Sequence, residues 1–305
     1  MTNQMNTITN PKRRPLSELN LMDDFLFQEL LSQEGDGEEF CRILLSTILG
    51  RPIRKVRIIP QKNILGIDTN RHGIRMDAYI EDISEEENVP GINAIDAQIM
   101  PDIYDVEPNN KYEKMSLPKR MRYYHGLIDT QLLSTNINYD KLQNVVIIVI
   151  LPYDPFDKNR MVYTIQNQCI EDPSVPYNDG ATKIFLYTRG TEGNPSQELR
   201  DMLKYLERSI DDNVTNQDID TIHQLVGRIK QRREIGINYM KSWELEQMYK
   251  QEGMEAGLEF GIEALISTCQ ELQVSIEETT SKIKQKFTLN QEQADEYIKK
   301  YWKKN

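Results

Sequence analysis

The sequence predicts an α/β protein in which a mixed sheet is flanked by helices and followed by a segment that is helical throughout. Side chains alternate in character along 73–82 and 91–100, a pattern typical of strands with one buried face. An unbroken apolar run, VVIIVIL at 145–151, is typical of a central strand covered on both faces. Beyond about residue 211 the apolar spacing is helical only. Strands interspersed with helices favour a sheet with helices packed on it.

Three parts are expected along the 305 residues. Residues 1–15 are polar and basic and favour a disordered arm. Residues 16–210 carry the α/β pattern, and 211–305 form an all-helical C-terminal extension. The chain is long enough to bury a sizeable core.

The first expected elements are two helices and a strand. SELNLMDDFLFQELLS at 17–32 places its apolar residues on one helical stripe, with Asn20 or Asp23 as its cap. GEEFCRILLSTILG at 37–50 continues as a second helix that Gly50 closes. RKVRIIP then reads as a strand that ends at its proline.

The two alternating strands that follow suggest a hairpin. Asp77 lies on the polar face of the strand at 73–82, whereas Asp96 and Gln98 share the polar face of the strand at 91–100. Pairing of these strands would bring the three polar side chains together. Either that face is exposed to solvent and the residues are ordinary surface groups, or the face lines a functional site.

The later elements complete the sheet and its helices. A helix is expected at 116–134 with Pro118 in its first turn, and another at 196–210. Strands are expected at 161–166 and 183–187, separated by turns rich in Pro, Gly and Asp.

Charge is unevenly distributed around a net value of −11, which does not favour nucleic-acid binding by the molecule as a whole. All charged residues of EDISEEE at 81–87 are acidic, whereas most charged residues of KYEKMSLPKRMR at 111–122 are basic. Each stretch has the ordinary interpretation of a solvated surface segment.

The expected location is the cytoplasm, with no membrane partner. The longest apolar run is far too short to span a bilayer, and no apolar core follows the basic N-terminus. Cys41, Cys169 and Cys269 are far apart and lack metal-like spacing, so reduced thiols are expected.

In the helical extension, EGMEAGLEFG places Gly253, Gly257 and Gly261 at every fourth position. A stripe of glycines permits a close helix–helix contact, but each glycine also weakens a helix by about 1 kcal/mol relative to alanine. Both interpretations stay open.

Taken in order, several stretches resemble the PD-(D/E)XK nuclease family transposases, relatives of the Rpn-type recombination-promoting nucleases. The stretches that carry the resemblance, over roughly 16–265, are LNLMDDFLFQELL, HGIRMDAYIED, AIDAQ, LPKRMRYYHGLID, VIIVILPYDPFDKNRMVYTI, DGATKIFLYTRG and EGMEAGLEFG. The family implies a restriction-endonuclease-like fold with a metal site at a hairpin.

The resemblance also implies site residues. Asp77 matches the first acid, Asp96 the second acid, and Gln98 the position of the motif lysine. Asp24 matches an acidic position that joins the cluster. Three departures are present: the second acid is usually Glu, the hairpin connection is longer and more acidic than expected, and relatives commonly have Lys where this chain has Gln28.

These residues suit a hard divalent cation, Mg²⁺ or Mn²⁺, because oxygen ligands hold such ions and leave positions open for water. Asp77, Asp96 and the main-chain carbonyl of Ala97 are the expected ligands. Gln98 carries no charge and cannot act as a base, but its amide can orient water or a phosphate oxygen.

The basic helix supplies the expected DNA contacts. Arg120 is the expected phosphate clamp, reinforced by the helix N-terminus, and Lys119, Arg122 and Tyr124 are expected beside it.

The expected function is that of a Mg²⁺-dependent DNA endonuclease associated with recombination or mobile elements. Two other classes stay open. One is a catalytically weak or inactive relative that binds nucleic acid or protein. The other is a scaffold in which 211–305 assemble a homo-oligomer.

Overall fold

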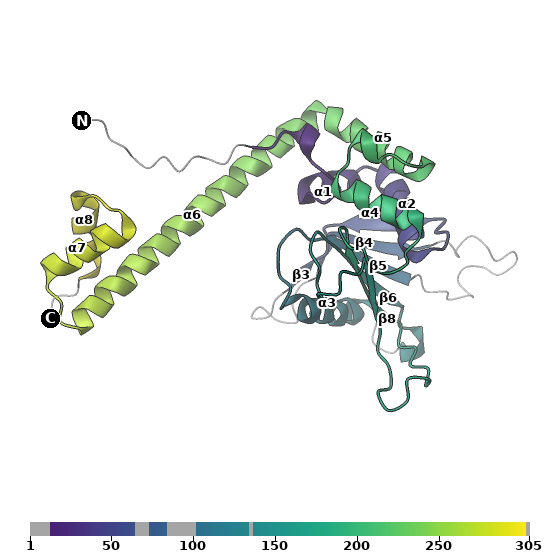
Figure 1. The fold of residues 1–305 in the computed structure, drawn as a ribbon, viewed down its shortest axis with the longest axis horizontal. Helices are drawn as coiled ribbons and strands as arrows, with labels where there is room; N and C mark the ends of the chain where they lie inside the picture. The colour runs from purple at the N-terminus through teal and green to yellow at the C-terminus, as the bar shows by residue number, and fades with distance from the viewer. Residues whose placement is uncertain (1–12, 65–72, 84–101, 134–136, 303–305) are drawn as a thin grey trace, which may run out of the picture. The chain divides into compact units, whose positions relative to one another are not determined.

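The computed structural model describes residues 13–64, 73–83, 102–133 and 137–302. It is an α/β structure built on a six-stranded mixed sheet (Figure 1). Across the sheet the order is β1-β4-β5-β6-β8-β7. The strands are β1 (Val56–Pro60), β4 (Ala78–Asp82), β5 (Asp102–Pro108), β6 (Val145–Leu151), β7 (Val162–Ile165) and β8 (Ala181–Tyr187).

The sheet changes from antiparallel to parallel pairing at β5. β4 pairs antiparallel with both β1 and β5, whereas β6 pairs parallel with β5 and β8. β7 closes the far edge antiparallel to β8. Two very short strands, β2 (Asn63–Ile64) and β3 (Ile74–Arg75), form a separate antiparallel pair.

Helices cover both faces of the sheet. Figure 1 shows α3 (Leu117–Leu132) on one face, and α1 (Asp24–Leu31), α2 (Asp36–Leu49), α4 (Gln197–Glu207) and α5 (Gln217–Gln231) gathered on the other side. The core under α3 joins Leu117, Met121 and Ile128 to the inward residues of β6, such as Ile147 and Val149. Single turns of 3₁₀ helix lie at Leu16–Glu18, Tyr139–Lys141 and Asp211–Asn213.

Local signals explain where these helices begin and end. Ser196 caps α4 by accepting a hydrogen bond from the Leu199 amide, and Asn216 caps α5 in the same way. Gly50 ends α2 with φ of 63°, the left-handed conformation that glycine adopts without strain. Gly37 allows α2 to pass close to α1, since a Cβ there would lie 2.6 Å from the Leu31 carbonyl oxygen.

Most of the expected elements are confirmed, with small shifts at their ends. The central strand at 145–151 is β6, buried between two parallel neighbours. The first helix is shorter than expected, because a turn comes before it. In that turn the main-chain amide of Asn20 donates to Asp23 Oδ2 at 2.7 Å, and the helix starts at Asp24.

The expected hairpin between 73–82 and 91–100 is wrong. Along its whole length β4 is paired with β1 on one edge and β5 on the other, so neither edge is left for another strand. Residues 91–100 themselves lie outside the described residues. The partner of β4 is β5, at Asp102–Pro108, whose alternation was hidden because it carries buried carboxylates where a half-buried strand usually has apolar groups.

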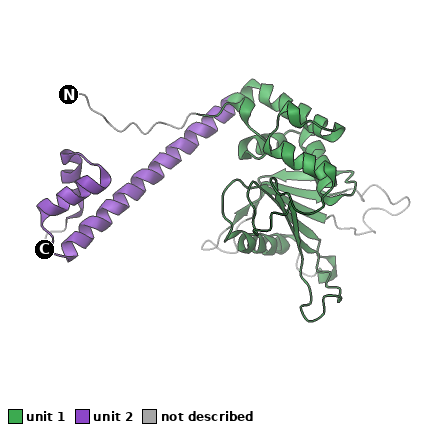
Figure 2. Cartoon of the chain, in the orientation of Figure 1, with its two compact units in different colours: residues 1–236 green, residues 237–305 purple. Residues whose placement is uncertain are grey.

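The chain divides into two compact units, Met1–Gly236 and Ile237–Asn305 (Figure 2). The first unit extends past the boundary expected at 210, because α5 packs against α1 and α2. The buried residues of α5 are Ile219, Ile222, Leu225, Val226 and Ile229.

The second unit contains most of α6 (Arg233–Glu271), α7 (Ile276–Phe287) and α8 (Gln291–Tyr301). Ile262 and Ile266 of α6 form its core with Ile283 and Ala294. Gly261 serves close packing, because a Cβ there would lie 3.3 Å from the Phe287 ring. Gly253 and Gly257 have nothing within 4 Å of an added Cβ, so the close-contact interpretation holds within this unit for Gly261 alone. Within the described residues no helix is long and apolar enough to cross a membrane.

Candidate functional site

The pairing of β4 with β5 places two carboxylates opposite each other. Ala78 pairs with Val106, so the next facing positions are Asp77 and Glu107. Because side chains alternate along a strand, Asp77 shares a face with Tyr79, and Glu107 shares that face with Asp105. Tyr79 belongs to the core under α3, so the acidic side chains lie on the face that α3 covers.

Helix α3 contributes a cation and a phenol to this face. Arg120 Nη2 lies 3.4 Å from Glu107 Oε2, and Nη1 of the same guanidinium contacts Glu113 Oε2. The Arg120 Cζ atom lies 5.8 Å from the centre of the Tyr124 ring. Arg120 is therefore held between two carboxylates of its own chain, with Tyr124 beside it.

Helix α1 reaches the start of β4. Asp24 begins the helix, and Gln28 follows one turn later on the same side. Gln28 Nε2 donates a hydrogen bond to the main-chain carbonyl oxygen of Asp77 at 3.2 Å. The Asp24 carboxylate is close enough to raise the pKa of both Asp77 and Glu107.

Burial and mutual repulsion favour the protonated forms of these acids. Burial, and then the charge of Asp24, raise the pKa of Asp77 to about 6. Burial, and then the charge of Asp77, raise the pKa of Glu107 to about 8, against the opposing effect of Arg120. Asp105 is completely buried, and burial followed by the charge of Glu107 raises its pKa well above the usual range. Burial, with Glu107 as the next cause, raises the pKa of Tyr124 to about 12.

Buried polar atoms without a hydrogen-bond partner gather at this place. Among the described residues, Gln28 Oε1, both Asp105 oxygens and Arg120 Nε belong to this cluster, and Asn109 Nδ2 belongs to the residue two positions after Glu107. Unsatisfied buried groups are few in native proteins, and each asks for an explanation such as water, an ion or a ligand. We therefore take the residues around this acidic pair as the candidate functional site.

Asn109 extends the pattern of β5. It follows Glu107 at a spacing of two residues, and its side chain is buried. Its main-chain N–H group donates to the Ile150 carbonyl oxygen at 2.8 Å, and its Oδ1 accepts from the main-chain N–H group of Lys111 at 2.9 Å. These contacts fix the residue and leave Nδ2 without a partner.

The donors suit a hard cation bound by few protein ligands. The candidate ligands are the carboxylate oxygens of Asp77 and Glu107, and a bound cation would lower the raised pKa values of both groups. Within the described ranges, no three His, Cys, Asp or Glu side chains form a group that could hold a metal ion. Mg²⁺ commonly uses one or two carboxylates, with water and substrate phosphate completing its shell, so Asp77 and Glu107 are the residues that could hold such an ion.

The structure brings four of the expected site residues together: Asp24, Asp77, Arg120 and Tyr124. The expectation that Arg120 is free to clamp phosphate does not match its contacts, because Glu107 and Glu113 engage its guanidinium.

The other expected residues do not join this group. Lys119 and Arg122 are exposed on α3. Asp96, Ala97 and Gln98 lie outside the described residues.

Asp105, Glu107 and Asn109 were missed by sequence reasoning. YDVEPN contains the same acid-x-amide spacing as IDAQ, so the signal was present. The sequence predicts no strand at this stretch, because two acids, a proline and an asparagine lie close together in it. Only the pairing of β5 with β4 and β6 shows that it is a buried strand.

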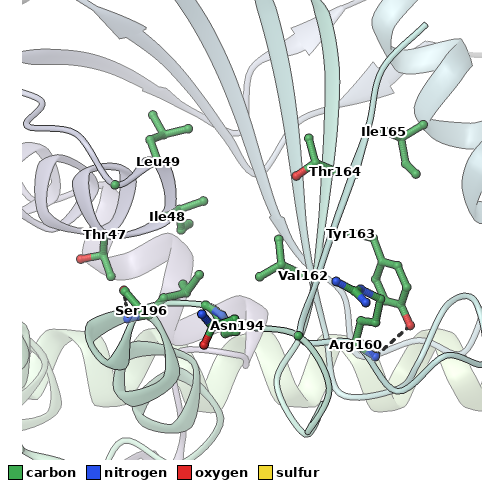
Figure 3. Close-up of a pocket in the computed structure, with 14 residues that line it drawn as sticks. Thr47, Ile48, Leu49, Arg160, Val162, Tyr163, Thr164, Ile165, Asn194 and Ser196 are labelled. Carbon is green, nitrogen blue, oxygen red and sulfur yellow. Dashed lines mark hydrogen bonds between the residues drawn. The ribbon is translucent and has the colours of Figure 1, made fainter. Parts of the chain in front are cut away.

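A separate cavity of about 630 Å³ lies among the end of α2, the edge strand β7 and the start of α4 (Figure 3). Some of its polar groups have partners: Ser196 Oγ caps α4, and the main-chain amide of Arg160 donates to the Tyr163 hydroxyl at 3.1 Å. The cavity contains none of the acidic residues described above.

Comparisons of the chain with protein-family models, with curated proteins and with solved structures found no match.

Proposed function

We propose that the protein is a Mg²⁺-dependent DNA endonuclease of the PD-(D/E)XK class, with Asp77 and Glu107 as its acid pair and Asn109 in the place of the motif lysine. This proposal keeps the family suggested by the sequence and moves the second half of its motif from Asp96-x-Gln98 to Glu107-x-Asn109. The mixed sheet with helices on both faces is compatible with the restriction-endonuclease-like fold that the class implies.

One observation carries the proposal: the acid directly before β4, Asp77, is next in register to an acid on the strand that pairs with β4, Glu107 of β5. The second acid is followed at the motif's spacing by a buried amide with an unsatisfied N–H group. The usual Glu of the family branch is restored at this position, whereas Asp96 departs from it.

Phosphodiester hydrolysis forms one P–O bond to the oxygen of water and breaks one P–O bond to a sugar oxygen, which leaves as a hydroxyl. A divalent cation bound by Asp77 and Glu107 would supply a more acidic water and neutralise charge on the phosphate. Asn109 Nδ2 is a neutral donor that can orient the water or a phosphate oxygen. Arg120 keeps Glu107 in place through their contact at 3.4 Å.

Exposed basic side chains supply the proposed contacts to the phosphate backbone of DNA. Lys111, Lys119 and Arg122 are exposed on α3 and the segment before it. They offset locally the net charge of −11, which would otherwise oppose binding of a polyanion.

The experiment is nicking of supercoiled plasmid DNA in Mg²⁺ or Mn²⁺. We expect the wild type to nick, Glu107→Gln to lose at least about 100-fold in rate, and Asp96→Asn to retain the wild-type rate. Equal rates for wild type and Glu107→Gln, or no cleavage with either ion, would contradict the proposal.

A second candidate is a relative that binds DNA without cutting it, and the contacts of Arg120 favour it. A guanidinium engaged by Glu107 and Glu113 is less available to phosphate, and an amide replaces the charged lysine. DNA affinity that falls steeply with salt, without cleavage under either ion, would select this candidate.

A further inference from the structure

Gln28 makes an unusual pair of contacts for a buried amide. Gln28 is a buried residue, with 9% of its surface exposed. Nε2 donates to the main-chain carbonyl oxygen of Asp77 at 3.2 Å, whereas Oε1 is buried and has no donor.

The orientation of this amide follows from chemistry. The oxygen and nitrogen of a glutamine side chain are told apart by their neighbours. The Asp77 carbonyl only accepts hydrogen bonds, so the atom that faces it must be the NH₂ group. The atom left without a protein partner is therefore the oxygen, and a buried acceptor without a donor costs about 1–3 kcal/mol.

The same carbonyl is held from a second direction. The main-chain amide of Gln61 donates to the main-chain carbonyl oxygen of Asp77 at 3.3 Å. The main-chain amide of Met76 donates to the main-chain carbonyl oxygen of Lys62 at 3.1 Å. Asp77 thus lies at a stretch of main chain fixed on one side by the segment before β2 and on the other by α1. Removing Gln28 would release the α1 side.

From these contacts we infer that Gln28 is a positioning residue for the acid pair: it fixes the main chain of Asp77 through Nε2 and holds a site water through Oε1. The inference rests on the proposed function. It assigns a role to α1, which carries both Gln28 and Asp24 toward the start of β4. A partner that orients a metal-binding carboxylate typically changes metal affinity by about 10–100-fold when it is removed.

The test is Mn²⁺ affinity, measured by calorimetry on the full chain after removal of metal by EDTA and dialysis. Gln28→Met keeps the size of the side chain and removes both hydrogen-bonding groups. Gln33→Met is the matched control, since Gln33 Nε2 also donates to a main-chain carbonyl, that of Glu29 at 3.0 Å, away from the acid pair.

We expect Gln28→Met to bind Mn²⁺ about 10–100-fold more weakly than the wild type, and Gln33→Met to bind within about twofold of it. Gln28→Glu keeps an acceptor and loses the donor, and we expect it to weaken binding as well, because its oxygen would face the Asp77 carbonyl. Melting temperatures in EDTA check that the variants are folded.

The outcomes separate the two claims. Wild-type protein that binds no Mn²⁺, or binds it equally well after Asp77→Asn, defeats the proposed function. Wild-type binding that depends on Asp77 but is unchanged in Gln28→Met overturns the role of Gln28 alone.

Discussion

Asp77, the residue before β4, is next in register to Glu107 of β5, and the charge of Asp77 is the largest electrostatic cause of the raised pKa of Glu107. A half-buried acid beside a buried one favours a proton or a cation between the two carboxyl groups. Protons and metal ions therefore compete for the same place, and several measurable consequences follow.

The first consequence concerns stability and pH. Folded Glu107 keeps its proton up to about pH 8, whereas the unfolded chain loses it near pH 4.5. Across that window the folded state binds more protons, so the free energy of unfolding falls as pH rises. Glu107→Gln cannot lose a proton, so we expect it to be more stable than the metal-free wild type at pH 8.5, by at least about 1 kcal/mol.

Urea unfolding in EDTA from pH 5 to 8.5 measures this difference, which should grow with pH. The exposed Glu192 provides a control, since Glu192→Gln should show no such trend. A Glu107→Gln variant that is less stable than wild type at pH 8.5 would contradict the assignment of a raised pKa.

A second consequence is proton release when metal binds. At pH 7 Glu107 is mostly protonated, and a carboxyl must lose its proton to bind a cation. We expect Mn²⁺ binding at pH 7 to release protons, and to release fewer at pH 8.5. Calorimetry in two buffers of different ionisation enthalpy counts them, and a proton count independent of pH would argue against Glu107 as a ligand.

The pairing of Arg120 with two acids gives a third prediction. Arg120→Gln leaves Glu107 and Glu113 without their shared cation, so we expect a loss of about 1–3 kcal/mol in the free energy of unfolding at pH 8. Arg122→Gln changes an exposed neighbour on α3 and should stay within about 0.5 kcal/mol of wild type. Equal effects of the two variants would show that the pairing of Arg120 with Glu107 and Glu113 does not stabilise the fold.

Sequence patterns were sufficient for much of this structure and failed at one instructive strand. The apolar run of β6 and the capped helix α4 were predictable, because burial and periodicity agree there. β5 was not, because Asp105 and Glu107 are acidic yet buried, and periodicity treats acids as markers of solvent. The alternation of 73–82 was sufficient to single out Asp77 as a candidate site residue. Its partner, Glu107, could be identified only from the register between β4 and β5.

In the helical extension, too, the sequence pattern was not sufficient without the three-dimensional contacts. Even spacing of Gly253, Gly257 and Gly261 suggested one shared role, but only tertiary contacts distinguish Gly261, which faces the Phe287 ring.

This difference gives a fourth prediction. Gly257→Ala should stabilise α6 by about 0.5–1 kcal/mol, because alanine favours a helix and the position is open. Gly261→Ala should give no such gain, because its methyl group would press on Phe287. Hydrogen exchange of the α6 amides measures both, and an equal gain at the two positions would contradict the packing described for Gly261.

The most direct test of the acid pair is Mn²⁺ binding to three proteins: wild type, Glu107→Gln and Asp96→Asn. Each variant removes one carboxylate and keeps the shape of its side chain. We predict that Glu107→Gln weakens binding by at least about 10-fold and that Asp96→Asn leaves it unchanged. Loss of binding in Asp96→Asn with full binding in Glu107→Gln would contradict the pairing of Asp77 with Glu107 as the metal site.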